Sequence, residues 1–167
     1  MKLKGQTVKA PEPITIVIPR EGEDDIILMA AAVLDDSEFL KICPEPVPPT
    51  KVIPGEPDQP FLDDPTFKAK VEEHNQRSVD WMFIKSLSAT EGLEWDTVDL
   101  NDPGTWANYR EELGTVFSKG EVAHIISKVM LANAMDQSRL EEAHKVFMEN
   151  RDRPQGSKEP SKSPVDQ

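Results

Sequence analysis

The chain has a single cysteine, Cys43, among its 167 residues. One cysteine excludes an internal disulfide and a cysteine-based metal cluster, and it is typical of a reducing cytoplasm. The three histidines, His74, His124 and His144, form no His-Glu-x-x-His pattern. The eight glycines form neither a Gly-x-Gly-x-x-Gly motif nor a phosphate-binding loop. These absences argue against nucleotide-binding enzymes and zinc hydrolases.

The sequence also lacks long apolar runs. Its longest, residues 26–34, is far too short to span a bilayer. Residues 1–6 lack the apolar stretch of a secretory signal peptide. We therefore expect a soluble, intracellular protein with no membrane partner.

What the sequence has in excess is acid and proline. The net charge is −12, there are 15 prolines, and only 37% of the residues are hydrophobic, which predicts a folded core smaller than the chain. Residues 1–20 and 151–167 are slightly basic, so the acidic excess falls on residues 21–150. An acidic body repels phosphate, so we expect no nucleic-acid partner. The acidity is interpreted as a solubility feature, with steering toward a basic partner as the alternative.

The first region, residues 1–43, predicts a β-hairpin followed by a short helix. Residues 14–18 are β-branched throughout and are followed by Pro19, which is typical of a strand. After a polar turn, residues 26–33 begin like a strand and end in alanines, so strand and helix are both open, with a returning strand favoured. Residues 35–38 can cap a short helix. An isolated hairpin is marginal in water, so it needs a partner face, either the helical region or another copy.

Residues 44–60 contain seven prolines in seventeen positions. This composition excludes a helix or a central strand and predicts an extended connector with polyproline character. The functional alternative is a ligand for an aromatic groove on another protein.

A long helix is predicted to follow the connector. Asp64 can cap it and Pro65 fits its first position. Residues 79–87 are apolar almost all round, which is typical of a helix buried on more than one side. This half of the helix, ending near residues 91–92, is predicted to be the centre of the core.

Three shorter helices are predicted from three start signals. The first is Asp102 followed by Pro103. The second is a capping box of Ser118 and Glu121. The third has the same pattern at Ser138, with Asp136 as a rival cap. The apolar residues on these helices are Trp106, Tyr109 and Leu113; Val122, Ile125, Ile126, Val129 and Met130; and Leu140, Ala143 and Phe147. Trp106 is interpreted as a core anchor, with contact to a binding partner as the alternative.

The predicted fold is therefore α+β. It consists of a small N-terminal β element with a short helix (1–43), a proline-rich connector (44–60), a mainly α-helical domain (61–150) and a disordered tail (151–167). On this division, removing residues 1–60 should leave a folded helical domain.

A metal site is the one chemical constellation to weigh. Glu121 and His124 are three residues apart, as are Glu141 and His144, a spacing that di-iron helix bundles use together with two further glutamates. Both glutamates are already explained as capping-box members. Cys43 has no assigned base. The residues thus favour a protein without catalytic residues, metal or cofactor, and a metal-dependent enzyme is the weaker alternative.

A family resemblance rests on the order of features between residues 77 and 148 and on the strand, apolar segment, Phe39 and proline-rich connector before them. The residues that carry the likeness are Trp81, 85–87, 93–98, 102–106, 121–122, 125–126, Val129, 132–133, 140–143 and Phe147 in the helical part, with 43–46 before it. They are packing signatures and carry no reaction. In this order and pattern the chain resembles the tail assembly chaperones of long-tailed, siphovirus-like bacteriophages.

The resemblance implies a function without chemistry. Such chaperones bind the tape-measure protein in the host cytoplasm before the tail tube polymerises, and they are absent from the mature virion. Many are also made in a longer, frameshifted form, which the polar tail would suit. A client helix would lie on apolar helix faces, either Val122, Ile126, Val129 and Met130, or Leu140 and Phe147. The alternative is a structural virion component, such as a tail or head-completion protein, that stays in the particle.

Overall fold

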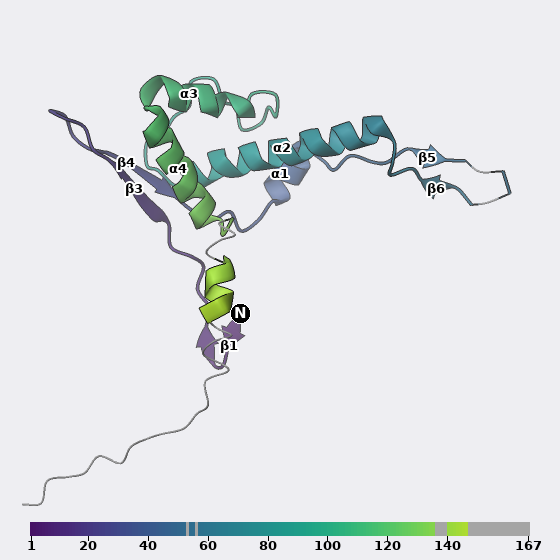
Figure 1. Ribbon diagram of the computed structural model, residues 1–167, viewed down its shortest axis with the longest axis horizontal. Helices are drawn as coiled ribbons and strands as arrows, with labels where there is room; N and C mark the ends of the chain where they lie inside the picture. Colours follow the sequence, from purple (N-terminus) through teal and green to yellow (C-terminus); the bar gives the residue numbers. More distant parts are fainter. Residues whose placement is uncertain (53, 56, 136–139, 147–167) are drawn as a thin grey trace, which may run out of the picture. The chain divides into compact units, whose positions relative to one another are not determined.

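The computed structural model describes residues 1–52, 54–55, 57–135 and 140–146 (Figure 1). Met1–Met135 form one compact unit and Asp136–Gln167 a second. In the second unit, residues 140–146 are helical. The predicted tail, the Ser138 helix start and Phe147 lie outside the described residues. Short antiparallel strand pairs combined with helices confirm the predicted α+β class.

The predicted hairpin is confirmed. Strands β3 (Ile14–Ile18) and β4 (Ile26–Ala30) pair antiparallel, with Ile16 opposite Leu28. Residues 26–33, open to strand or helix from sequence, are therefore a strand as far as Ala30. Side chains alternate between faces along a strand, and the buried face here holds Ile16, Ile18, Leu28 and Ala30. A smaller ladder precedes it, formed by β1 (Lys2–Leu3) and β2 (Gln6–Thr7).

Helix α1 (Ser37–Ile42) follows the hairpin as predicted. The proline-rich connector differs from the expected extended path, because β5 (Thr50–Lys51) and β6 (Gln59–Pro60) pair antiparallel. The N–H of Phe61 also donates to the Pro49 carbonyl at 2.7 Å. The connector therefore turns back on itself. Pro60 is tolerated because a two-stranded ladder has only edge positions.

Helix α2 (Pro65–Leu87) begins where the sequence predicts. The Asp64 carboxylate accepts a hydrogen bond from the Phe67 N–H at 2.7 Å, which completes the cap. The C-terminal half buries Trp81, Phe83, Ile84 and Leu87, so the prediction of a central core helix is confirmed. The helix ends at Leu87, before the residues 91–92 that were expected to end it.

The helix start predicted at Pro103 is wrong. The Asp102 carboxylate accepts from the Gly104 N–H at 2.9 Å and closes a turn there, because a short acidic side chain bonds its own nearby backbone as readily as a helix end. Helical structure begins later, with the 3-10 turn η1 (Trp106–Asn108), and continues as α3 (Tyr109–Val116).

Helix α4 (Lys119–Ala132) starts at the predicted capping box. Ser118 accepts from the Glu121 N–H, and the Glu121 carboxylate accepts from the Ser118 N–H. At the C-terminal end of this helix, Asn133 has a φ of −94°, and the next residue, Ala134, is left-handed with φ 53°. Asn133 uses its amide side chain to bond neighbouring elements.

One hydrophobic core joins the hairpin to the helices. The hairpin packs against α2 and α4, and α2 packs against η1. The expected boundary between residues 1–43 and a separate helical domain is therefore not found, and the helices supply the partner face that the hairpin needs. The buried residues of this core are Ile16, Ile18, Leu28, Ala30, Phe39, Cys43, Trp81, Phe83, Ile84, Leu87, Trp106, Tyr109, Leu113, Ile125 and Val129.

An aromatic cluster ties α1 to the helices. The ring centroid of Phe39 lies 5.8 Å from that of Trp81 and 5.9 Å from that of Trp106. Trp106 is fully buried, and its indole N–H donates to the Asp99 carbonyl at 3.0 Å. Trp106 is thus a core anchor, as predicted.

Trp106→Ala should lower the free energy of unfolding by about 3–5 kcal/mol, the usual cost of truncating a buried tryptophan. Urea denaturation measures it. Trp106→Phe keeps most of the ring volume but loses the bond to Asp99, so its loss should be smaller. An alanine variant with an unchanged unfolding curve would contradict the core assignment.

Deleting residues 1–60 should abolish cooperative unfolding, because the deletion removes six core side chains: Ile16, Ile18, Leu28, Ala30, Phe39 and Cys43. Thermal circular dichroism tests this. Deleting only residues 1–8, whose strands are exposed, is the control and should leave the transition intact. A cooperative thermal transition after the longer deletion would instead support a separately folding helical domain.

Candidate partner-binding groove

Glu112 on α3 anchors residues 96–98, in the segment that connects α2 to η1. Its carboxylate accepts from the backbone N–H groups of Asp96 and Thr97, at 2.9 and 2.7 Å, and from the Thr97 hydroxyl at 2.5 Å. Burial is the largest single influence and raises the pKa of Glu112, but these bonds and one from the Val98 backbone together outweigh it and hold the pKa below 4.5. The ionised carboxylate therefore fixes residues 96–98 against α3.

An apolar groove opens beside this anchor, between the hairpin, residues 93–96 and α3. We call it the α3 groove, and its volume is about 270 Å³. Three buried leucines line it together with half-exposed apolar side chains and a polar rim. The lining residues are Leu28, Leu87 and Leu113; Ile26, Leu93, Trp95, Val116 and Phe117; and Glu94, Asp96, Glu112 and Thr115.

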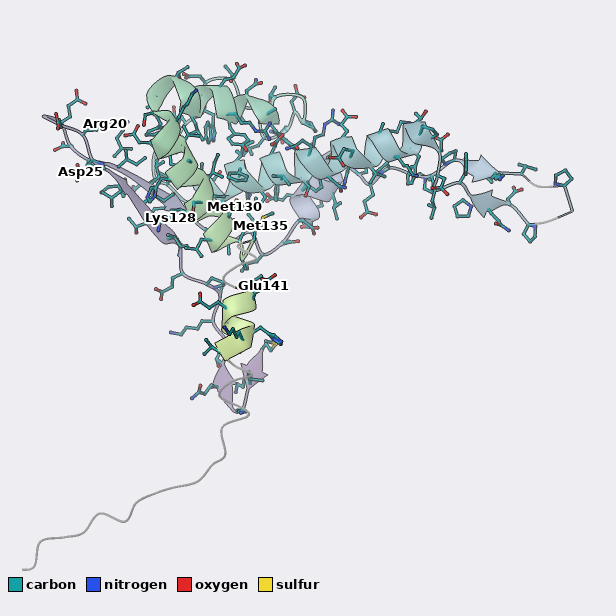
Figure 2. All side chains as sticks on the ribbon, in the orientation of Figure 1. Arg20, Asp25, Lys128, Met130, Met135 and Glu141 are labelled. Atoms are coloured by element: carbon teal, nitrogen blue, oxygen red, sulfur yellow. The ribbon has the colours of Figure 1, made fainter. Side chains whose placement is uncertain are left out.

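The side chain of Arg20, just after β3, packs over the ring of Phe117, which lies between α3 and α4. Its guanidinium carbon lies 5.6 Å from the Phe117 ring centroid, and the group forms an ion pair with Glu121. The Ser118 N–H and the Arg20 side chain hold the pKa of Glu121 below its usual value. The hairpin loop is itself closed by the Arg20 N–H and the Asp25 carboxylate, 3.4 Å apart (Figure 2).

The rim of the α3 groove is acidic. Glu94, Asp96 and Glu112 line it, and among the described residues no basic side chain belongs to the lining. An apolar floor with an acidic rim complements an amphipathic helix whose apolar face is flanked by lysine or arginine. Its chemistry therefore fits a protein segment, through burial of one or two apolar side chains and charge attraction at the rim.

The residues predicted for partner binding do not gather in this groove. Val129 is completely buried in the core, and Val122, Ile126 and Met130 are half-buried against it. In Figure 2, Met130 and Lys128 project to opposite sides of α4. Leu140 is 49% exposed but belongs to the second compact unit, and Phe147 lies outside the described residues. The α4 stripe is thus mainly a core face.

The metal hypothesis gains no geometric support. One Glu121 oxygen bonds Arg20 and the other bonds the Ser118 N–H. Glu141 and His144 lie in the other compact unit. Within the residues that the structure describes, no three His, Cys, Asp or Glu side chains are grouped as metal ligands. Cys43 is buried at the end of α1, where its carbonyl lies 3.1 Å from the His74 Nε2.

Sequence reasoning included Leu113 among the apolar helix residues and Trp95 within the packing signature of residues 93–98, but it missed Val116 and Phe117. Phe117 directly precedes the Ser118 cap and Val122 lies four residues after it, the positions of a hydrophobic staple. That pattern could have marked Phe117 as a fixed apolar side chain. No pattern in the neighbouring sequence identifies Val116 as a groove residue. Its 61% exposure follows from the place where α3 ends beside the hairpin.

Glu112→Gln should lower the urea midpoint at pH 7 by the equivalent of about 1 kcal/mol, because it weakens hydrogen bonds to a charged acceptor. Since the folded pKa of Glu112 lies below 4.5, the stability it adds is present above that pH and is lost as pH falls through the folded pKa. The wild-type advantage should therefore vanish in acid. Glu111→Gln, the same change one residue earlier on an exposed side chain, is the control. A constant difference at all pH values would contradict the anchor role.

Comparisons of this chain with protein-family models, curated proteins and solved structures find no match. The family assignment therefore rests on the sequence pattern alone and stays a prediction. None of the described helices combines the length and the apolar character needed to cross a membrane.

Proposed function

We propose that this protein is a non-catalytic tail assembly chaperone of a long-tailed bacteriophage. It binds the tape-measure protein in the host cytoplasm and is released before the virion is complete. The observation that carries the proposal is the acidic-rimmed, apolar α3 groove. The resemblance of residues 77–148 to such chaperones supports it.

The groove suits a client that must be held and later released. One apolar client side chain, fully buried, contributes about 1.5–3 kcal/mol before the cost of ordering is subtracted. A few such buried side chains along a long client helix give a moderate affinity. The polymerising tail tube can then displace the chaperone from the client. The acidic rim speeds encounter with basic client segments, and this gain falls as salt screens the charges.

Co-expression with the gene product encoded immediately downstream should raise the soluble yield of that product, and the pair should co-elute on sizing. Val116→Asp places a charge on the exposed lip of the groove, so binding should weaken about tenfold or more, as for an interface anchor. Val47→Asp makes the same change at a site that is 84% exposed and outside the groove, and binding should persist.

Two results would contradict the proposal. The first is a client that stays insoluble on co-expression. The second is stoichiometric amounts of this protein in purified particles, detected by mass spectrometry. The second result would favour a structural virion component. If the two aspartate variants bound the client equally well, the client site would have to lie outside the α3 groove.

A further inference from the structure

In the described part of the chain, β3 pairs with β4 alone, so no other strand joins its outer edge. On the neighbouring strand, the Met29 N–H donates to the Thr90 hydroxyl at 2.8 Å, and the same hydroxyl donates to the Met29 carbonyl at 3.2 Å. The Met29 backbone groups thus point away from β3. Thr15 lies opposite Met29, so the two form a non-hydrogen-bonded antiparallel pair. Thr15 and Val17, two residues apart, therefore direct their N–H and C=O groups outward.

These outward groups have no partner in the described part of the chain. No hydrogen bond there joins the N–H of Thr15 or Val17 to another group. The other edge of the hairpin is covered, because Ala31 exchanges hydrogen bonds with Ser86 and Met29 bonds Thr90. Exposed edge strands usually carry charges that prevent pairing with other chains, and residues 14–18 carry none.

Two prolines set the length of this edge. Pro13 and Pro19 lie three residues before and three after Ile16. Because strand residues alternate in direction, both share the outward position of Thr15 and Val17, yet neither has an N–H. The edge thus offers two donors, placed symmetrically about Ile16.

We propose that β3 pairs antiparallel with β3 of a second copy, around a twofold axis at Ile16. Thr15 then lies opposite Val17 of the second copy, and the reverse. Each such pair exchanges two N–H···O=C bonds, so all four free donors of the two edges are used. The hairpins join into a four-stranded sheet, whose outer face carries the exposed side chains of Val17 and Ile27 from both copies.

The prolines select this register over its neighbours. A slip of two residues in either direction sets the ring of Pro13 or Pro19 against a carbonyl that must accept a hydrogen bond. With the axis at Ile16, Pro13 faces Pro19 of the second copy beyond the ladder, and no donor is stranded. The edge is complementary to its own inverted copy, so a second copy is its partner. The ladder is short, so the dimer should dissociate on dilution.

The test uses the unmodified chain. Sedimentation should show a mass that rises from 18.7 kDa toward twice that value with concentration. Amide hydrogen exchange by NMR should show Thr15 and Val17 protected about tenfold or more at high concentration and unprotected on dilution. The Met29 amide, bonded within the chain, should be protected throughout. A monomer at every concentration, or a dimer with unprotected Thr15 and Val17 amides, would overturn the proposal.

A pair of variants at one position sharpens the result. Thr15→Pro removes one outward donor and no bond of the hairpin ladder, so it should give a monomer. Thr15→Val keeps the N–H and the β-branched shape and should dimerise like the parent. If circular dichroism shows that Thr15→Pro is unfolded, the amide exchange of the unmodified chain decides. A folded Thr15→Pro variant that still dimerises would place the interface elsewhere.

Discussion

Ser86 is the point on which the arrangement of the hairpin and helices depends. Its hydroxyl donates to the Ala31 carbonyl at 2.7 Å and accepts from the Asn133 side chain at 3.3 Å, and its own carbonyl accepts from the Ala31 N–H at 3.0 Å. Asn133 in turn accepts from the Val33 N–H at 2.8 Å. Ser86 is fully buried, so each missing bond would leave a desolvated polar group. The ends of β4, α2 and α4 are therefore fixed to one another.

This network positions both surfaces proposed for binding. By holding β4 against the end of α2, it leaves Ile26 and Leu28 beside Leu87 and the α3 groove. Together with the bonds between Met29 and Thr90, it occupies the outer edge of β4, which leaves β3 as the open edge of the hairpin. Hydrophobic contacts alone are not directional. The hydrogen bonds of Ser86 and Asn133 supply the direction that fixes the hairpin over α2 and α4.

Features set by residues close together in the chain can be predicted from the sequence, whereas features set by contacts between distant residues cannot. Asp64 with Pro65, and Ser118 with Glu121, act within one helical turn, so their caps follow from sequence. The same reasoning fails at Asp102, whose carboxylate has two local backbone choices. It also fails at Val129, because a stripe on α4 looks the same whether it meets the core or a partner. The α3 groove combines residues from Ile26 to Phe117, and no pattern within a short window contains it.

The two surfaces use different strands of one hairpin, which has a consequence for client binding. β4 contributes Ile26 and Leu28 to the α3 groove, whereas the open edge belongs to β3. Self-association therefore need not occupy the groove, and a dimer would present two grooves to one client. For a long helical client, binding at one groove raises the effective concentration at the second, provided that the client spans both. The affinity of each single groove can then be low enough for release, while the two grooves of a dimer together hold the client. Because dilution dissociates the dimer, it removes this gain in affinity.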